Sequence, residues 1–281
     1  MHFVHSLWSK PLIVSRRNVA LQRAILVNIF SAAASYAWIK HNGGKMDLYC
    51  DGFSKDTLEF IPYDHIYELK VPNNVPTACW ACGKFLTLEK MELGDVHIDN
   101  DVYIKGDEIF NKVLDTSYDV VVQSTEDDKT VQHDYYDNIR TLFNNYNIKP
   151  LYCTIDDSIS YNCGTIGFNN QELKMKYLKE YFYTLNQIIH NKDVVNILKN
   201  DKNSVPDLVL EQQFLYELSR DYKVNNLLGT SDELYDNALK YNYQHVLGGY
   251  KEKAINSIIN ELKYVDEDLF RKAMKQASYL M

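Results

Sequence analysis

Residues 94–104 read GDVHIDNDVYI. Val96 to Ile98 predict a short buried strand, and Val102 to Ile104 predict a second apolar strand soon after it. Asp99 and Asp101 stand between the two, and carboxylates are costly at the end of an apolar strand unless a cation neutralises them. Oxygen ligands of this kind favour Mg²⁺ or Mn²⁺, so the stretch predicts a divalent metal site.

Asn100 separates the two aspartates and tolerates turn conformations. We therefore expect the chain to turn at Asn100, so that Asp99 and Asp101 reach one ion. An Asp-x-Asp by itself is common in solvated turns, and the interpretation as a metal site depends on residues elsewhere in the chain.

The composition limits the classes of partner. The chain has 281 residues, with 38 acidic side chains against 30 Lys and Arg, a formal charge of −8. This balance argues against a nucleic-acid binder, which normally carries a basic face. Five cysteines are scattered over the chain, which does not resemble a disulfide framework and indicates a reducing, cytoplasmic location. Cys79 and Cys82 form a Cys-x-x-Cys, but a zinc site needs two more ligands of suitable spacing and a redox site needs a thioredoxin-like context, so packing on one helix face is the favoured interpretation.

Residues 19–39 form the only long apolar stretch, and Ser15-Arg16-Arg17 before it faintly resembles an export signal. Polar residues interrupt the stretch at Gln22, Arg23 and Asn28. We therefore expect a buried helix, with no transmembrane segment.

The order of the predicted elements indicates an α/β fold. A strand at 2–7, a helix to about residue 40 and a strand at 46–50 form a parallel pair with a crossover helix. Further strands are expected at 119–123, 151–155, 162–168, 223–228 and 243–246, and helices at 76–91, 133–146 and much of 171–222. Residues 8–11 and 124–129 are expected to be loops. We predict one Rossmann-like domain with a mixed sheet flanked by helices over residues 1–251, and a helical tail over residues 252–281 packed on it.

Four polar motifs stand at strand ends or on loops beside them, where open α/β sheets bind ligands. They are Asp99-Asn100-Asp101, the run 161–167 with Asn162 and Gly164, the run 210–215 with Glu211 and Gln212, and the run 245–251 with His245, Gly248 and Lys251. A neutral imidazole can complete a metal site begun by two carboxylates, and a glycine and lysine beyond it can meet a diphosphate.

This set resembles the GT-A glycosyltransferases over about residues 1–251, in particular the retaining group that includes glycogenin and the bacterial lipopolysaccharide galactosyltransferases. That group carries a strand-terminal Asp-x-Asp, an Asn-x-Gly strand, an Asp-Gln-Asp helix and a late His-x-x-Gly-x-x-Lys in the same order. The chain departs from it with Glu211-Gln212-Gln213 in the third motif, and with Glu252-Lys253 in place of Pro-Trp after the last lysine.

The resemblance implies a role for each motif. Asp99, Asp101 and His245 would hold Mn²⁺ or Mg²⁺, and Asn100, Gly248 and Lys251 would belong to the same cofactor site. Asn162 and Gly164 would bind substrate, and Glu211 and Gln212 would be the catalytic pair. Lys84 would reach the ribose or phosphate of the donor, unless it is a solvated helix lysine. The opening His5-Ser6-Leu7-Trp8 resembles the related mannosyl- and toxin-type glucosyltransferases, so Trp8 would stack on the nucleotide base.

The expected function is metal-dependent transfer of a sugar from a nucleotide-diphosphate sugar, with UDP favoured, to a hydroxyl of a glycan or protein. The resemblance favours retention, whereas an inverting enzyme would need a base such as Glu211. A phosphatase of the haloacid dehalogenase type also begins at an Asp-x-Asp, but at its first strand. An inactive transferase that only binds nucleotide or glycan is the non-enzymatic alternative.

Overall fold

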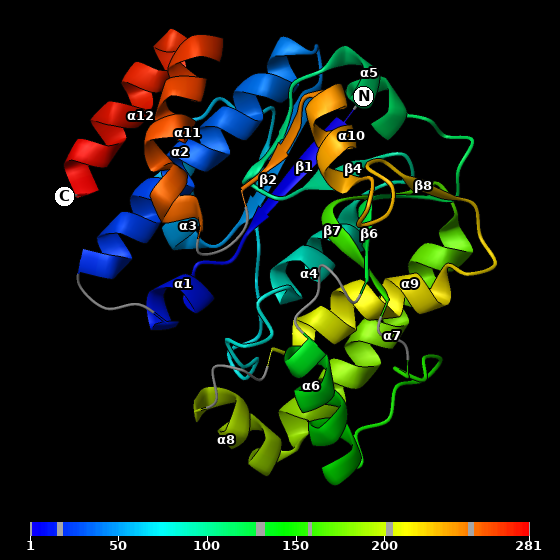
Figure 1. The fold of residues 1–281 in the computed structure, drawn as a ribbon. Helices are drawn as coiled ribbons and strands as arrows, with labels where there is room; N and C mark the ends of the chain where they lie inside the picture. The colour runs from blue at the N-terminus through cyan, green and yellow to red at the C-terminus, as the bar shows by residue number, and fades with distance from the viewer. Residues whose placement is uncertain are drawn as a thin grey trace. The chain divides into compact units, whose positions relative to one another are not determined.

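The computed structural model describes residues 2–15, 19–127, 133–156, 159–200, 205–246 and 250–280. Its contacts divide the chain into two compact units, each made of several segments (Figure 1). Unit 1 comprises Met1–Lys70, Asp95–Leu114 and Ala238–Met281, and unit 2 comprises Val71–Gly94 and Asp115–Asn237. The predicted division into residues 1–251 and a tail stays a prediction.

Unit 1 contains four parallel strands in the order β3 (Ile66–Glu68), β2 (Lys45–Cys50), β1 (His2–Leu7), β4 (Val96–Ile98). The long helix α2 (Val19–His41) joins β1 to β2 and ends where Gly43 adopts a φ of 79°. Only a residue that tolerates this left-handed conformation can end a helix in that way. The parallel pair with its crossover helix confirms the predicted α/β, Rossmann-like fold class.

The C-terminal tail is helical as predicted. Helices α11 (Lys251–Val265) and α12 (Glu267–Leu280) both pack on α2. Trp38 of α2 donates from Nε1 to Glu261 of α11 at 3.0 Å, and the Lys105 ammonium lies 2.9 Å from the same carboxylate. Buried Ile258 and Leu262 of α11 and Leu269 and Ala273 of α12 complete the apolar contact.

Unit 1 also contains three short helices and a separate pair of strands. These are α1 (Lys10–Ser15), α3 (Gly52–Leu58), α5 (Asp107–Val113), β5 (Val102–Ile104) and β9 (Tyr243–His245). Helix α10 (Leu234–Tyr241) carries the chain from the second unit into the first.

Unit 2 is built around β6 (Val120–Glu126), which pairs antiparallel with β7 (Ser160–Phe168) and parallel with β8 (Val224–Asn226). Its helical elements are α4 (Cys82–Lys90), α6 (His133–Asn145), α7 (Gln171–His190), α8 (Lys192–Asn200), the π-helical turn η1 (Leu208–Gln213) and α9 (Phe214–Leu218). The mixture of parallel and antiparallel pairs agrees with the predicted mixed sheet. Across the described ranges, no helix is long and apolar enough to cross a membrane.

Two local predictions in unit 2 are wrong. The strand expected at 151–155 is absent, because helix carboxylates bind its backbone N–H groups. Glu180 accepts from Leu151 and Tyr152, and Glu217 accepts from Thr154 and Ile155. The helix expected from residue 76 begins only at Cys82. The N–H of Ala81, the residue before the helix, donates to the Asp207 carboxylate at 2.6 Å.

Two predicted loops are also partly wrong. Residues 8–11 do not form a loop throughout, since α1 begins at Lys10; Pro11 fits its first turn, where no intrahelical donor is needed. Ser124 to Glu126 belong to β6 and not to a loop, because they pair with Ser160 to Asn162 of β7. Lys129, the end of that predicted loop, lies outside the described residues.

A buried histidine on β1 makes unit 1 sensitive to acid. His5 has Nδ1 2.8 Å from the Tyr63 hydroxyl and Nε2 3.0 Å from the Ser35 hydroxyl. Burial lowers the pKa of His5 from 6.5 to about 3, against the opposing charge of Asp101. Between pH 6.5 and about pH 3, His5 is therefore protonated in the unfolded chain and neutral in the folded chain.

We expect this group to reduce the free energy of unfolding by about 1.4 kcal/mol for each pH unit below 6.5. Urea unfolding at pH 7, 6 and 5 measures the slope, which should be shallower in His5→Gln. The matched control is His190→Gln, at an exposed histidine of α7. Equal slopes in the wild type and His5→Gln would contradict the prediction.

Candidate metal centre

The two aspartates lie in the turn between β4 and β5. Asp99 follows Ile98 directly, and its carbonyl oxygen accepts a hydrogen bond from the Val102 N–H at 3.0 Å. This bond closes a four-residue turn with Asn100 and Asp101 at its centre, which confirms the predicted turn. Asn100 donates from Nδ2 to Oδ1 of Asn28 at 3.1 Å, so the turn is tied to α2.

His245 reaches the aspartates through a short antiparallel ladder. In the register of β5 and β9, Val102 lies opposite His245. The Val246 N–H donates to the carbonyl oxygen of Asp101 at 3.0 Å, which extends the ladder to the turn itself. The backbone alone therefore brings a histidine from near the end of the chain to the Asp-x-Asp.

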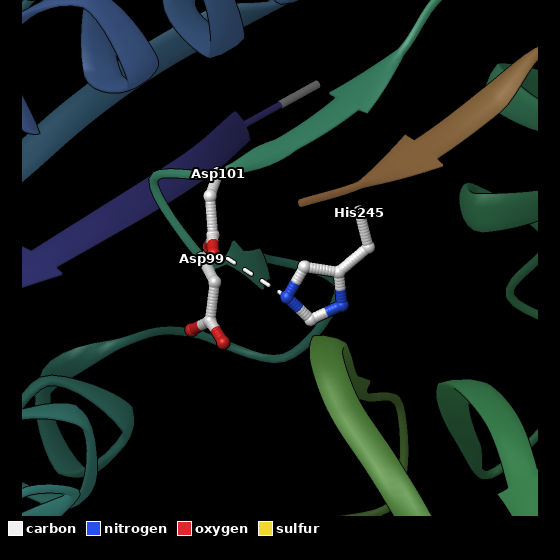
Figure 2. Close-up of side chains that lie close together, drawn as sticks. All are labelled: Asp99, Asp101 and His245. Atoms are coloured by element: carbon white, nitrogen blue, oxygen red, sulfur yellow. Dashed lines mark ion pairs between the residues drawn. The ribbon is translucent and has the colours of Figure 1, made fainter. Parts of the chain in front are cut away.

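Asp99, Asp101 and His245 form a compact group of possible metal ligands (Figure 2). One ligand atom from each lies within 4.8 Å of the others, and His245 Nε2 lies 3.6 Å from Asp101 Oδ1. Ligands at about 2.1 Å from a Mg²⁺ or Mn²⁺ ion are at most about 4.2 Å apart, so only a small closure is needed. Two carboxylates and one imidazole suit such an ion. Within the described residues, no other group of three such side chains converges in this way.

Lys251, the first residue of α11, contacts the same carboxylate. Its Nζ lies 2.5 Å from Asp101 Oδ2, and the Asp101 side chain is only 4% exposed. Burial by itself would raise the pKa of Asp101. The positive charges of Lys251 and His245 outweigh burial and hold that pKa well below its usual range. Asp101 is therefore a buried, ionised carboxylate beside the Lys251 ammonium and the His245 ring.

In unit 2, Lys84 and Glu211 form a buried ion pair. Lys84 Nζ donates to Glu211 Oε1 at 2.6 Å and to the carbonyl oxygen of Cys163 at 3.1 Å. The side chains are 5% and 1% exposed. The reading of Lys84 as a solvated helix lysine is therefore wrong. Its expected contact with a donor ribose or phosphate stays a prediction.

The other predicted residues of unit 2 belong to a hydrogen-bonded set around β7 and η1. Asn162 accepts from the Gly164 N–H at 3.0 Å and donates to Glu126 Oε1 at 2.7 Å, and Gln212 accepts from the Tyr136 hydroxyl at 3.2 Å. Gln212 and Glu211 lie on the π-helical turn, a rare conformation that occurs often at functional sites. The sequence predictions do not include Glu126 among the polar residues of this set, because they place its segment in a loop. The signal that could have found it is a carboxylate at the end of the apolar strand β6.

A family model described as "Family of unknown function (DUF6734)" matches residues 1–275. The chain belongs to this family. The matched range includes the turn with Asp99 and Asp101, the His245 strand and Lys251, and it covers residues of both units. No curated protein matches the chain.

In this DUF6734 member, a serine–histidine pair not predicted from sequence lies next to Asp99. His97 of β4 is buried; its Nε2 lies 2.7 Å from the Ser6 hydroxyl, and its Nδ1 lies 3.9 Å from Asp99 Oδ1. When Ser6 donates to Nε2, the proton of the neutral ring sits on Nδ1 and faces Asp99. His97 stands in the quoted stretch, but its partner Ser6 is far away in sequence, so no local pattern could reveal the pair.

Trp8 and Gly248 complete the predicted residues of unit 1. Trp8 directly follows β1, is half-buried and has the Lys10 ammonium 5.9 Å from its ring centre. Because β1 and β4 are parallel neighbours, their carboxyl ends share one edge of the sheet, and Trp8 and Asp99 both follow at that edge. Gly248 lies outside the described residues.

The Cys-x-x-Cys fits the packing reading best. Cys79 and Cys82 are buried and form no disulfide, and the same holds for the other three cysteines. Burial raises the pKa of the Cys82 thiol to about 12 and that of Cys79 well above its usual value. Thiols that keep their protons are poor metal ligands and poor nucleophiles.

Proposed function

We propose that this chain is a metal-dependent glycosyltransferase of the GT-A type. It would move a sugar from a nucleotide-diphosphate sugar, with UDP favoured, to a hydroxyl of a glycan or protein acceptor. The observation that carries the proposal is the convergence of Asp99, Asp101 and His245, three residues singled out by the order of their motifs. The assignment to the GT-A glycosyltransferases rests on that motif order.

The residues of unit 1 have separable tasks in this proposal. Asp99, Asp101 and His245 would hold Mn²⁺ or Mg²⁺. The ion supplies positive charge to the two phosphates, which must leave as a diphosphate when the sugar–oxygen bond breaks. Lys251 adds a cation for the same phosphates. Trp8 offers an aromatic face to the base at the neighbouring strand end.

The Lys84–Glu211 ion pair supports retention over inversion. An inverting transferase needs a carboxylate that takes the acceptor's proton. The Glu211 carboxylate already pairs with the Lys84 ammonium, 2.6 Å from Oε1, so it would have to give up this partner to take the acceptor's proton. In a retaining enzyme the departing phosphate can take that proton instead. The substrate-binding role of Asn162 and Gly164 and the catalytic role of Glu211 and Gln212 stay predictions.

The surroundings of the proposed reaction follow from composition and cysteine chemistry. None of the five cysteines forms a disulfide and all are buried, which supports a reducing compartment, and we include a cytoplasmic location in the proposal. The formal charge of −8 argues against a nucleic acid as partner, so the phosphates of a small donor would be met by a few placed cations and not by a broad basic face.

Calorimetric titration of UDP, then GDP, with and without Mn²⁺ tests the proposal. We expect UDP to bind at least about tenfold more tightly with Mn²⁺ than without it, since an ion held by Asp99, Asp101 and His245 would supply positive charge for the phosphates. A panel of UDP-sugars should then show release of UDP. Hydrolysis of simple phosphate esters without nucleotide binding would favour the phosphatase. Tight nucleotide binding without turnover on any acceptor would favour the inactive binder.

A further inference from the structure

The Asp101 carboxylate, one of the proposed metal ligands, already contacts the Lys251 ammonium. Lys251 Nζ lies 2.5 Å from Asp101 Oδ2, while His245 Nε2 lies 3.6 Å from Oδ1. A buried carboxylate is costly without a positive partner. Lys251 supplies this partner when no metal is bound.

A divalent ion and the Lys251 ammonium compete for this carboxylate. Both are positive, and water screens their repulsion little around a side chain that is 4% exposed. Lys251 also blocks one of the two oxygens of Asp101. Binding of the metal by both oxygens of Asp101 therefore requires that Lys251 move away, and binding through Oδ1 alone is opposed by the charge of Lys251.

Lys251 is suited to such a move. It is the first residue of α11, and its side chain is 25% exposed, much more than that of Asp101. A lysine has a flexible four-carbon stem and a compact charge, so its ammonium can change partner without a change in the helix. The new partner must be an anion that arrives with the metal, and a diphosphate bound to the ion meets this requirement.

We propose that Lys251 is a resident cation of the metal centre, which leaves Asp101 when the divalent ion binds and then pairs with the diphosphate. The inference rests on the proposed function and adds a regulation to it. Without nucleotide, Lys251 competes with the metal and keeps its affinity low. With nucleotide, the displaced Lys251 gains a phosphate, so metal and nucleotide bind cooperatively and neither is held firmly alone.

The test measures Mn²⁺ binding through the electron paramagnetic resonance signal of the free ion. Wild type, Lys251→Met and Lys251→Arg are titrated with and without saturating UDP. Lys253→Met removes an exposed lysine two positions further along α11 and is the matched control. Without UDP, we expect Lys251→Met to bind Mn²⁺ about tenfold more tightly than the wild type and the control. Lys251→Arg, which keeps a cation, should not gain affinity. UDP should raise Mn²⁺ affinity strongly in the wild type and little in Lys251→Met.

Loss of Lys251 leaves the Asp101 charge poorly compensated, so thermal unfolding is measured on the same proteins. Lys251→Met should unfold at a lower temperature without metal, and Mn²⁺ should raise its midpoint more than that of the wild type. If Lys251→Met does not fold, Lys251→Gln serves instead, because its amide can still donate to the carboxylate. If the wild type binds Mn²⁺ and UDP but the neutral variant gains no affinity, the exchange is wrong and the transferase proposal stands. If no variant binds Mn²⁺, both fall.

Discussion

Asp101→Asn is expected to abolish the Mn²⁺-dependent part of UDP binding, with a loss of affinity of at least about 100-fold in the presence of the ion. The substitution keeps the shape of the side chain and removes its charge. An amide binds a divalent ion weakly, and the carboxylate it replaces lies beside both His245 and Lys251. The measurement is calorimetric titration of UDP with and without Mn²⁺.

His245→Ala, which removes the imidazole of the group, should likewise abolish the Mn²⁺-dependent part of UDP binding. The backbone of β9 keeps its pairing with β5, because the ladder uses main-chain groups only. Asp107→Asn is the matched control, since Asp107 is an exposed aspartate in the first turn of α5. Full Mn²⁺ dependence in Asp101→Asn and His245→Ala would show that the three side chains meet without holding an ion.

The largest expected effect on stability belongs to the buried pair in unit 2. Lys84→Met should reduce the free energy of unfolding by about 3–5 kcal/mol, because it leaves the Glu211 carboxylate in an apolar interior without its ammonium. Urea unfolding, followed by circular dichroism, measures the change. Lys90→Met, at an exposed lysine of the same helix, should cost less than about 1 kcal/mol.

A double variant separates the pair from the packing around it. Lys84→Met with Glu211→Leu removes both charges, and replacing a whole buried pair by apolar side chains is often nearly neutral. We expect the double variant to recover most of the stability lost in Lys84→Met. If the two substitutions instead add their costs, the contact at 2.6 Å contributes little, and the destabilisation comes from repacking.

Local patterns predicted those elements whose backbone partners are other strands or their own helix. The apolar runs of β1, β2, β4, β6 and β7 and the end of α2 near Gly43 are examples. The strand expected at 151–155 failed because distant carboxylates, Glu180 and Glu217, bind its N–H groups. Apolar periodicity contains no information about such side-chain partners.

For the candidate site too, the sequence predicted which residues are involved but not all of their contacts. The residue types and motif order picked out Asp99, Asp101 and His245, and the turn at Asn100 followed from local preference. The contact of Lys251 with Asp101, the placement of His97 between Ser6 and Asp99, and the burial of Lys84 depend on three-dimensional packing. A lysine on a helix can lie in solvent or in the interior, and the sequence does not show that Glu211 is available as the buried partner of Lys84.

The β5–β9 ladder also sets the order in which this site can appear during synthesis. The chain leaves unit 1 at Leu114 and returns to it at Ala238, so both aspartates emerge from the ribosome long before His245 does. Until then β5 has no partner strand, and the turn at Asn100 cannot receive the hydrogen bond from Val246. A nascent or truncated chain therefore contains the two aspartates without the third side chain of the group until His245 itself has been made.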